Sequence, residues 1–204
     1  MRALVVTGGL APARVDWLPH YDRTIACDSG YDTAMRLGLE VDEVVGDLDS
    51  TRFRKDLVAS GIIPCSHDKD ESDTELALMR LPEGAAYDLI GGGGGRLDHL
   101  IALFASFRRF GPPRFWLSDS DLVVPVSGHF SFPLHSGCQV SFFCVGGEAR
   151  IDCPGLVWPL DGFTLDALHV SLSNRTTGEV LEGECAGLAW VRLPLETFAQ
   201  VAST

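Results

Sequence analysis

Two carboxylates one residue apart, Asp47 and Asp49, stand where an apolar run stops at a glycine. The run Glu43-Val44-Val45 is typical of the end of a buried strand, and the segment from Thr51 is typical of a helix with Asp49 or Ser50 as its N-cap. Acidic side chains between a parallel strand and a helix N-terminus can bind a hard cation such as Mg²⁺ together with phosphate oxygens. The structural alternative is that Asp49 and Ser50 only cap the helix and Asp47 is a solvated turn residue.

A second acidic cluster occupies residues 68–75. Ser72 and Glu75 have the spacing of a capping box, so they have a structural role at the start of a helix. The cluster also contains Asp68, Lys69, Asp70 and Asp73. Several like charges in one turn lower stability unless cations neutralise them. We therefore expect Asp70 and Asp73 to bind a metal ion or phosphate.

A run of five glycines, Gly91, Gly92, Gly93, Gly94 and Gly95, precedes Arg96 and His99. Glycine runs are usually flexible linkers. Between a strand and a helix, however, glycines allow backbone N–H groups to approach phosphate closely. The run matches neither the Walker A pattern nor a complete G-x-G-x-x-G. Arg96 offers a cationic fork for phosphate, and His99 is either a ligand contact or a capping side chain.

The elements that position these residues alternate between short apolar strands and helices as far as about residue 125, which indicates an α/β domain with a mostly parallel sheet. Strands are predicted at 3–6, 24–26, 43–45, 62–64, 87–90 and 114–117, and helices at 31–37, 51–60, 73–80 and 97–110. The loops after five of the strands are rich in Asp and Gly. Because parallel strands end at one edge, these loops should gather where such sheets bind ligands.

After this point the sequence contains short β-rich runs separated by turns, a pattern that is typical of an all-β sandwich or small barrel. No helix is predicted there. We expect an N-terminal α/β domain over residues 1–120 that carries the residues suited to a hard cation and phosphate. A C-terminal β-sandwich domain over residues 121–204 is expected to serve as a lid, for substrate binding or for dimerisation.

Composition restricts the possible partners. The chain has 204 residues, 46% of them hydrophobic, and a formal net charge of −12. Nucleic acid is not expected as a partner, because phosphate backbones require a basic surface. No apolar run approaches the roughly 20 residues of a membrane span. The N-terminal apolar run ends at Thr7-Gly8-Gly9, which is too short for a signal peptide.

Six cysteines, Cys27, Cys65, Cys138, Cys144, Cys153 and Cys185, contain no C-x-x-C pair. A zinc knuckle or a thioredoxin-type motif is therefore not indicated. Scattered cysteines at apolar strand positions are typical of a cytoplasmic protein with reduced thiols in its core.

Several motifs together resemble the thiamin pyrophosphokinase family. In the first half they are Cys27-Asp28-Ser29-Gly30, Gly46-Asp47-Leu48-Asp49-Ser50, the run from Asp68 to Leu78, and Gly94-Gly95-Arg96-Leu97-Asp98-His99. In the second half they are the run from Gly155 to Leu160 and Ser171-Leu172-Ser173-Asn174. Each motif is weak alone, but their order and spacing also match.

The resemblance implies transfer of the diphosphate group of ATP to the hydroxyl of thiamin, giving thiamin diphosphate and AMP, with Mg²⁺ required. It implies a homodimer in which thiamin lies between the first domain of one subunit and the second domain of the other. It assigns Mg²⁺ and polyphosphate binding to Asp47, Asp49, Asp70 and Asp73. ATP would be bound by Asp28, Ser50, Lys69, Gly91–Gly95, Arg96 and His99. Asp98 would line the reacting end, and Trp158, Ser173 and Asn174 would contact thiamin.

This assignment agrees with the chemistry of the residues. Phosphoryl-type transfer depends on positioning and on charge neutralisation, which metal ions, Arg and backbone N–H groups supply. An acidic crevice with an aromatic face also suits the thiazolium cation of thiamin. One of the carboxylates could deprotonate the hydroxyl, but the sequence does not select it. The chain departs from the family at Cys27 and Ser29, which replace alanine and glycine, and at Leu103, which replaces an asparagine.

Three alternatives remain open at this point. The protein could be an ATP-dependent kinase or diphosphokinase acting on another acceptor. It could be an Asp-nucleophile phosphatase, although that class places its carboxylate pair after the first strand and here the pair follows the third. It could also be a non-catalytic sensor of thiamin or nucleotide, against which the four metal-type carboxylates and Arg96 argue.

Overall fold

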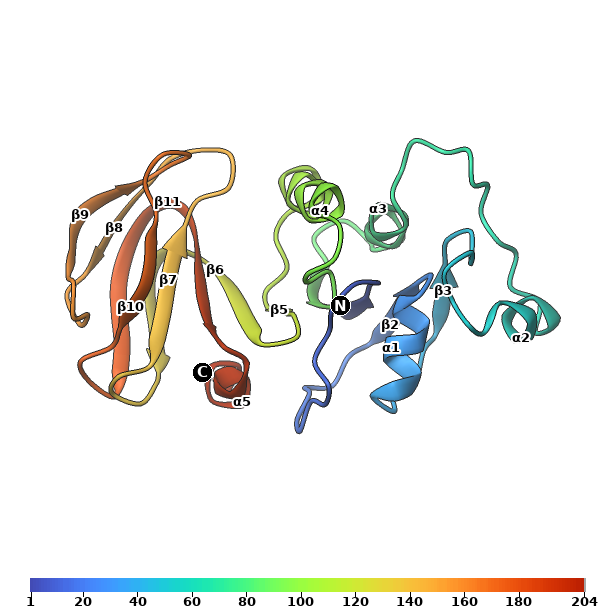
Figure 1. Ribbon diagram of the computed structural model, residues 1–204, viewed down its shortest axis with the longest axis horizontal. Helices are drawn as coiled ribbons and strands as arrows, with labels where there is room; N and C mark the ends of the chain where they lie inside the picture. Colours follow the sequence, from blue (N-terminus) through green and yellow to red (C-terminus); the bar gives the residue numbers. More distant parts are fainter. Residues whose placement is uncertain (204) are drawn as a thin grey trace. The chain divides into compact units, whose positions relative to one another are not determined.

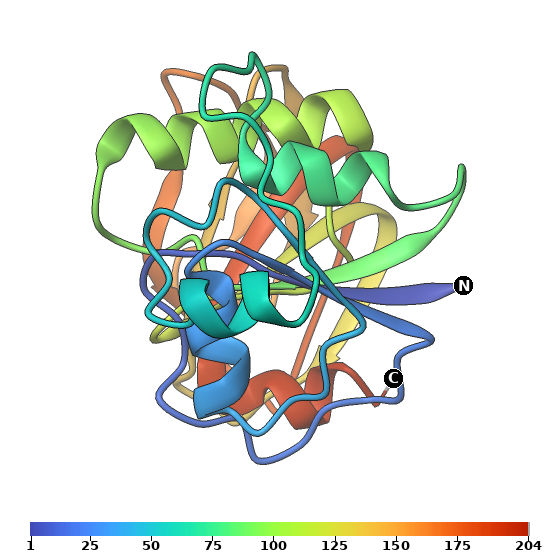
Figure 2. The same ribbon diagram turned by 90° about the vertical axis from the view of Figure 1, so that its right-hand side faces the viewer.

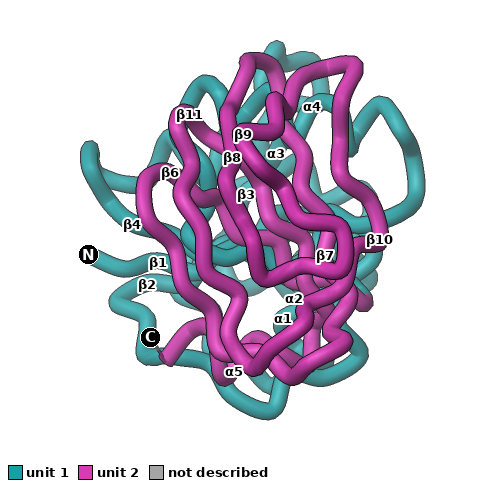
Figure 3. The backbone as a smooth tube through the Cα atoms, turned by 90° about the vertical axis from the view of Figure 1, so that its left-hand side faces the viewer, with its two compact units in different colours: residues 1–119 teal, residues 120–204 magenta. Residues whose placement is uncertain are grey.

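The computed structural model describes residues 1–203. The chain divides into two compact units, residues 1–119 and 120–204 (Figure 3). The division lies one residue before the one expected from the sequence. Among residues 1–203, every helix is too short or too polar to cross a membrane.

The N-terminal unit is built on a parallel sheet (Figure 1). Its strands are β1 (Arg2–Val6), β2 (Arg23–Cys27), β3 (Glu43–Val45), β4 (Ala86–Ile90) and β5 (Trp116–Leu117). They lie in the order β3-β2-β1-β4-β5. The strand order therefore reverses between β1 and β4, which is the place where open α/β sheets bind ligands. The strands are apolar because helices cover both faces of such a sheet.

Four helices belong to this unit: α1 (Gly30–Arg36), α2 (Arg54–Ala59), α3 (Asp73–Met79) and α4 (Leu97–Phe110). Figure 2 shows α3 and α4 on one face of the sheet and α1 on the other. The helix predicted over residues 97–110 is confirmed at both ends. The predicted capping box is also confirmed, since Ser72 and Glu75 exchange hydrogen bonds at the start of α3.

Two predictions for this unit are wrong. The helix expected from Thr51 begins at Arg54 with Phe53 as N-cap, so neither Asp49 nor Ser50 caps it. The backbone N–H of Ser50 instead donates to Asp28 Oδ1 over 3.3 Å. The strand expected at residues 62–64 is absent, and the segment is irregular. This apolar run lies beyond the edge strand β3, where Ile63 is 88% exposed.

The C-terminal unit is antiparallel (Figure 1). Its strands are β6 (Asp121–Pro133), β7 (Gln139–Phe143), β8 (Ala149–Cys153), β9 (Leu160–Leu165), β10 (Ser171–Arg175) and β11 (Val180–Pro194). The N-terminal part of β11 pairs with β8 and its C-terminal part with β7, on either side of a register shift between Cys185 and Ala189. The β-rich prediction is confirmed, although β6 and β11 each join two runs that the sequence separates.

This unit also contains helices that were not expected. The 3₁₀ helix η1 (Leu195–Thr197) leads into α5 (Phe198–Val201) at the end of the chain. Both are too short to show helical periodicity in the sequence, and they are stabilised by the burial of Phe198 and Val201. All six cysteines of the chain are free thiols, four of them buried.

Candidate active site

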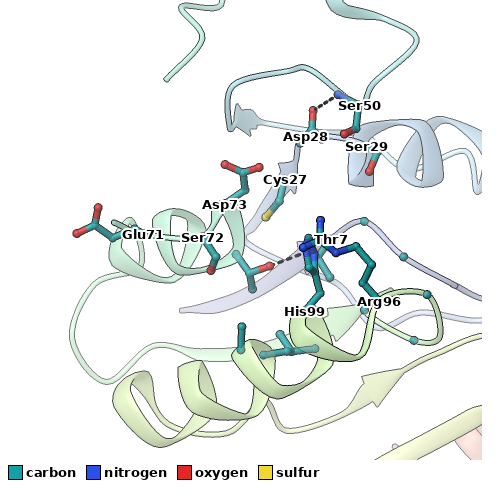
Figure 4. Close-up of a pocket in the computed structure, with 18 of the residues that line it drawn as sticks. Thr7, Cys27, Asp28, Ser29, Ser50, Glu71, Ser72, Asp73, Arg96 and His99 are labelled. Atoms are coloured by element: carbon teal, nitrogen blue, oxygen red, sulfur yellow. Dashed lines mark hydrogen bonds between the residues drawn. The ribbon is translucent and has the colours of Figure 1, made fainter. Parts of the chain in front are cut away.

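A cavity of about 590 Å³ lies at the carboxyl ends of the strands of the N-terminal unit (Figure 4). This volume is within the range of small-molecule sites. The walls come from the loops after β1, β2 and β4, from the loop that leads into α3, and from the first turns of α4. The cavity therefore occupies the point where the strand order reverses, as expected for a ligand site in this type of sheet.

The glycine run forms one wall, but most of its N–H groups do not face the cavity. The N–H of Gly91 donates to Leu117 O over 3.0 Å, that of Gly92 to Gly8 O over 2.8 Å, and that of Gly93 to Leu10 O over 3.0 Å. The expectation that all five N–H groups are available to phosphate is therefore wrong for these three. Within residues 1–203, the N–H groups of Gly94 and Gly95 have no protein acceptor.

The first glycine of the run is needed for close packing. A Cβ at Gly91 would lie 2.2 Å from Thr7 O, and its φ of +99° is one that other residues rarely adopt. At this position the loops after β1 and β4 pass each other in direct backbone contact. Gly91 is thus structural, whereas Gly92, Gly93, Gly94 and Gly95 line the cavity.

Three carboxylates meet at the acidic side of the site. Asp28, Asp47 and Asp73 each have an oxygen within 4.8 Å of the other two. Asp28 is buried and has a φ of +45°, which turns the chain directly after β2. Gly46 allows this approach, because a Cβ there would lie 3.0 Å from Asp73 Cγ. Asp28 was predicted to contact ATP, and the structure places it among the candidate metal ligands.

The electrostatics of this group favour a bound cation. Burial raises the pKa of Asp73, and the charges of Asp47 and Asp28 raise it further. Lys69 opposes this shift, with its Nζ 3.0 Å from Asp73 Oδ1. Carboxylate oxygens are the donors that Mg²⁺ prefers. The three residues therefore fit this ion, which would relieve their mutual repulsion.

A second group shares Asp47 with the first. Asp47, Asp49 and His67 also have ligand atoms within 4.8 Å of one another. Burial alone would raise the pKa of Asp47, but its hydrogen bond with His67 and the N–H of Asp49 hold that pKa below its usual value. The hydrogen bond to Asp47 in turn raises the pKa of His67. His67 was not predicted, because nothing in the sequence distinguishes it from its charged neighbours.

Two further predicted carboxylates, Asp70 and Asp98, lie outside both carboxylate groups. Asp70 lines the cavity but belongs to neither carboxylate group, so the metal set predicted from sequence is only partly assembled. Asp98 is exposed and is not among the residues that line the cavity. It forms a hydrogen-bonded ion pair with Arg96, in which Arg96 Nε donates to Asp98 Oδ1 over 3.1 Å.

Basic side chains line two parts of the cavity. Arg96 and His99 approach from the start of α4, whereas Asp28 and Ser50 lie on the opposite side (Figure 4). Lys69 also lines the cavity, next to the carboxylates. An anionic ligand with its metal ion could therefore contact positive charge at one end and the carboxylate-bound ion at the other.

Some lining residues were not assigned a role from the sequence. Ser29 and Thr7 face the cavity from the loops after β2 and β1, and Ala102 and Leu103 form an apolar wall on α4. Thr7 Oγ1 is hydrogen-bonded to Thr74 Oγ1 over 2.7 Å. Residues of these types occur throughout the chain, so the sequence alone does not mark them as site residues, and only the tertiary structure brings them together.

The three residues predicted to contact thiamin lie in the C-terminal unit. Trp158 is 61% exposed, whereas Asn174 is 1% exposed. The Asn174 amide donates to Trp158 O over 2.7 Å and accepts from Trp158 N–H over 3.2 Å. Asn174 therefore holds the backbone of Trp158, and a direct contact of its side chain with thiamin stays a prediction. Ser173 is exposed, with a φ of +54°.

Comparison with protein families gives a match within the N-terminal unit. Residues 16–112 match the model of the thiamin pyrophosphokinase catalytic domain. This range contains both acidic clusters, the glycine run, Arg96 and His99. A comparison with curated protein sequences gives no match.

Solved structures of similar fold cover both units. Thiamin pyrophosphokinase from Geobacillus thermodenitrificans has a TM-score of 0.73 at 20% identity, over 95% of this chain and 97% of that one. Thiamine pyrophosphokinase from Bacillus subtilis has a TM-score of 0.75 at 19% identity, over 95% and 99%. The Candida albicans thiamin pyrophosphokinase has a TM-score of 0.69 at 14% identity, over 95% and 89%. At these identities the likeness shows a common fold.

Proposed function

We propose that this protein is a thiamin pyrophosphokinase, in line with the match of residues 16–112 to the catalytic domain of that family, and that it transfers the diphosphate group of ATP to the hydroxyl of thiamin. The observation that carries this proposal is the cavity itself. Asp28 and Asp73 line it together with a glycine wall and the basic side chains Arg96, Lys69 and His99, and the oxygen of Asp47 lies within 4.8 Å of those of Asp28 and Asp73. Such a set suits a polyphosphate carried with a metal ion.

We propose that Asp28, Asp47 and Asp73 hold Mg²⁺, with Asp49 beside them. When bound, the ion would neutralise charge on the transferred phosphates. Asp70 and Lys69 would face the polyphosphate, together with Arg96, His99, Ser50 and the free N–H groups of Gly94 and Gly95. Arg96 would exchange its partner Asp98 for a phosphate oxygen, which would leave Asp98 available at the reacting end.

In the reaction the hydroxyl oxygen of thiamin attacks the β phosphorus of ATP. The bond from that phosphorus to the oxygen bridging it to the α phosphorus breaks, and AMP leaves with this oxygen. The proton of the hydroxyl passes to a carboxylate of the site or to solvent. The protein aligns these atoms and neutralises the charge that develops on them. The reaction needs no covalent intermediate with the protein.

For the C-terminal unit we propose roles in thiamin binding and in assembly of a homodimer. Exposed Trp158 offers an aromatic face to the thiazolium cation, and Ser173 lies on the neighbouring strand β10. Asn174 would fix the backbone of Trp158 from within the unit. We also propose a β-sandwich arrangement for this unit and a cytoplasmic location for the protein, which its six free thiols support.

Isotopic labelling tests the reaction type. With ATP labelled at the β phosphorus, the label should appear in thiamin diphosphate, and with ATP labelled at the α phosphorus it should remain in AMP. Single phosphoryl transfer would instead leave the β label in ADP. Release of inorganic phosphate without any phosphorylated thiamin would contradict the proposal and favour a phosphatase.

A further inference from the structure

The two candidate metal ligands Asp47 and Asp49 lie on a strained segment, here called the acidic loop, residues 46–52. Leu48 has a φ of +60°, which is rare for a residue with a side chain. Its side chain is 0% exposed and packs with Val44 and Leu57. Such a conformation is strained and persists only where the surroundings enforce it.

Asp32, in the first turn of α1, makes several of the hydrogen bonds that hold the acidic loop in this conformation. Asp32 Oδ2 accepts a hydrogen bond from Thr51 Oγ1 over 2.6 Å, and Asp32 Oδ1 accepts one from Arg52 Nε over 2.7 Å. The backbone N–H of Arg52 also donates to Asp32, over 3.3 Å to Oδ2. One carboxylate thus binds two consecutive residues at the end of the acidic loop.

Two further residues near the start of α1, Asp28 and Tyr31, support this attachment. The N–H of Ser50 donates to Asp28 Oδ1 over 3.3 Å. The rings of Tyr31 and Phe53 are in edge contact, with centroids 5.4 Å apart. Residues 51–53 are therefore each held by a contact to the first turn of α1, and Ser50 is held by Asp28 in the loop that precedes this helix. Asp32 contributes the shortest of these hydrogen bonds and binds through both of its oxygens.

Asp32 itself is not among the residues that line the cavity, so its effect on the site must be indirect. We propose that Asp32 is a positioning residue for the metal site: by holding Thr51 and Arg52, it keeps the acidic loop in the conformation that directs Asp47 and Asp49 toward the cation. The inference rests on the proposed function in so far as that function places a divalent cation at these carboxylates.

The test is Mn²⁺ binding to the full chain without substrates, measured by electron paramagnetic resonance. We expect D32N to raise the Mn²⁺ dissociation constant roughly tenfold, the lower end of the effect of removing a direct partner of a metal ligand, because Asp32 holds the residues that follow Asp49 and not the ligands themselves. The matched control is D42N. Asp42 also accepts a backbone N–H, that of Thr24 over 2.7 Å, but lies at the amino end of β3, away from the cavity. D42N should bind Mn²⁺ like the wild type.

An unchanged dissociation constant in folded D32N would overturn the role of Asp32, and so would an equal loss in D42N. If D32N does not fold, T51V decides, because it removes the Thr51 hydroxyl and leaves the carboxylate in place. Weaker Mn²⁺ binding in T51V would support the proposal, and unchanged binding would overturn it. If the wild type itself binds no Mn²⁺, the metal site of the proposed function is overturned. If the wild type and D32N bind Mn²⁺ equally well, only the role of Asp32 is overturned.

Discussion

Asp47 is the carboxylate on which the candidate site depends most. It belongs both to the group with Asp28 and Asp73 and to the group with Asp49 and His67. Its side chain is 14% exposed, whereas that of Asp49 is 54% exposed. A cation at either group would therefore contact Asp47, and the loss of its charge cannot be replaced by a neighbour.

The first prediction concerns this charge. Asp47→Asn should lower turnover by roughly two orders of magnitude or more, because it removes a charged oxygen that acts on the transferring phosphates. Asp70→Asn is the matched control, since Asp70 lines the same cavity outside both carboxylate groups, and its effect should be clearly smaller. Steady-state kinetics at several Mg²⁺ concentrations measures both. Equal losses in the two variants, or normal turnover in Asp47→Asn, would refute the assignment.

The second prediction concerns pH and stability. Burial alone would raise the pKa of Asp32, but the hydrogen bonds from Arg52 and Thr51 lower it. A carboxylate whose pKa is lower in the folded state stabilises the fold above its unfolded pKa of about 3.9 and loses that contribution as pH falls through the folded value. The wild type should therefore exceed Asp32→Asn in unfolding free energy at pH 7, and the difference should shrink below about pH 4.

Urea denaturation across this pH range measures the difference. A gap between wild type and Asp32→Asn that stays constant down to pH 3 would show that the charge of Asp32 does not stabilise the fold.

At the scale of the elements, the contact between the loops after β1 and β4 determines the shape of the cavity. Gly91→Ala would place a methyl group 2.2 Å from Thr7 O at a φ of +99°. We expect a loss of about 2 kcal/mol or more in unfolding free energy, from backbone strain and overpacking together. Gly95→Ala is the control. It has a positive φ of +70° but no atom within 4 Å of the added methyl.

Gly95→Ala should therefore lose only the cost of the left-handed conformation, about 1–2 kcal/mol. Chemical denaturation of both variants gives the comparison. If Gly91→Ala were no less stable than Gly95→Ala, the close contact between these loops would not stabilise the fold.

The elements that could be predicted are those whose local pattern agrees with their surroundings. The strands β1, β2 and β4 are mostly apolar because they are buried inside a parallel sheet. The long helix α4 has amphipathic spacing and a glycine directly after it, and its bounds were predicted correctly. By contrast, the apolar run at residues 62–64 has no sheet neighbour beyond β3 and forms no strand.

The parts of the site that could not be predicted depend on contacts between distant segments. The Asp28 carboxylate turns toward Asp47 and Asp73 because its backbone adopts a φ of +45°, which the sequence does not reveal. The N–H groups of Gly92 and Gly93 are engaged because the loop after β1 lies against them. Asn174 carries a polar side chain in a family-like motif, but only the structure shows that it is buried and donates to the backbone carbonyl of Trp158, which is distant in the sequence.

For the whole molecule, charge and fold point to the same chemistry. A chain with a formal net charge of −12 can bind a triply or quadruply anionic nucleotide only where cations offset its own carboxylates. The N-terminal unit provides such a place, because Arg96 and His99 line the cavity opposite Asp28 and Lys69 lies beside Asp73 (Figure 4). The same negative charge favours a cationic acceptor such as thiamin.

The most direct test of this account is AMP formation from ATP and Mg²⁺, measured with and without thiamin. The account predicts that AMP appears only when thiamin is present, in equal amount to thiamin diphosphate. ADP in place of AMP would contradict diphosphate transfer, and AMP release that is independent of thiamin would contradict the acceptor. The absence of any nucleotide turnover would contradict catalysis and leave a protein that only binds these ligands.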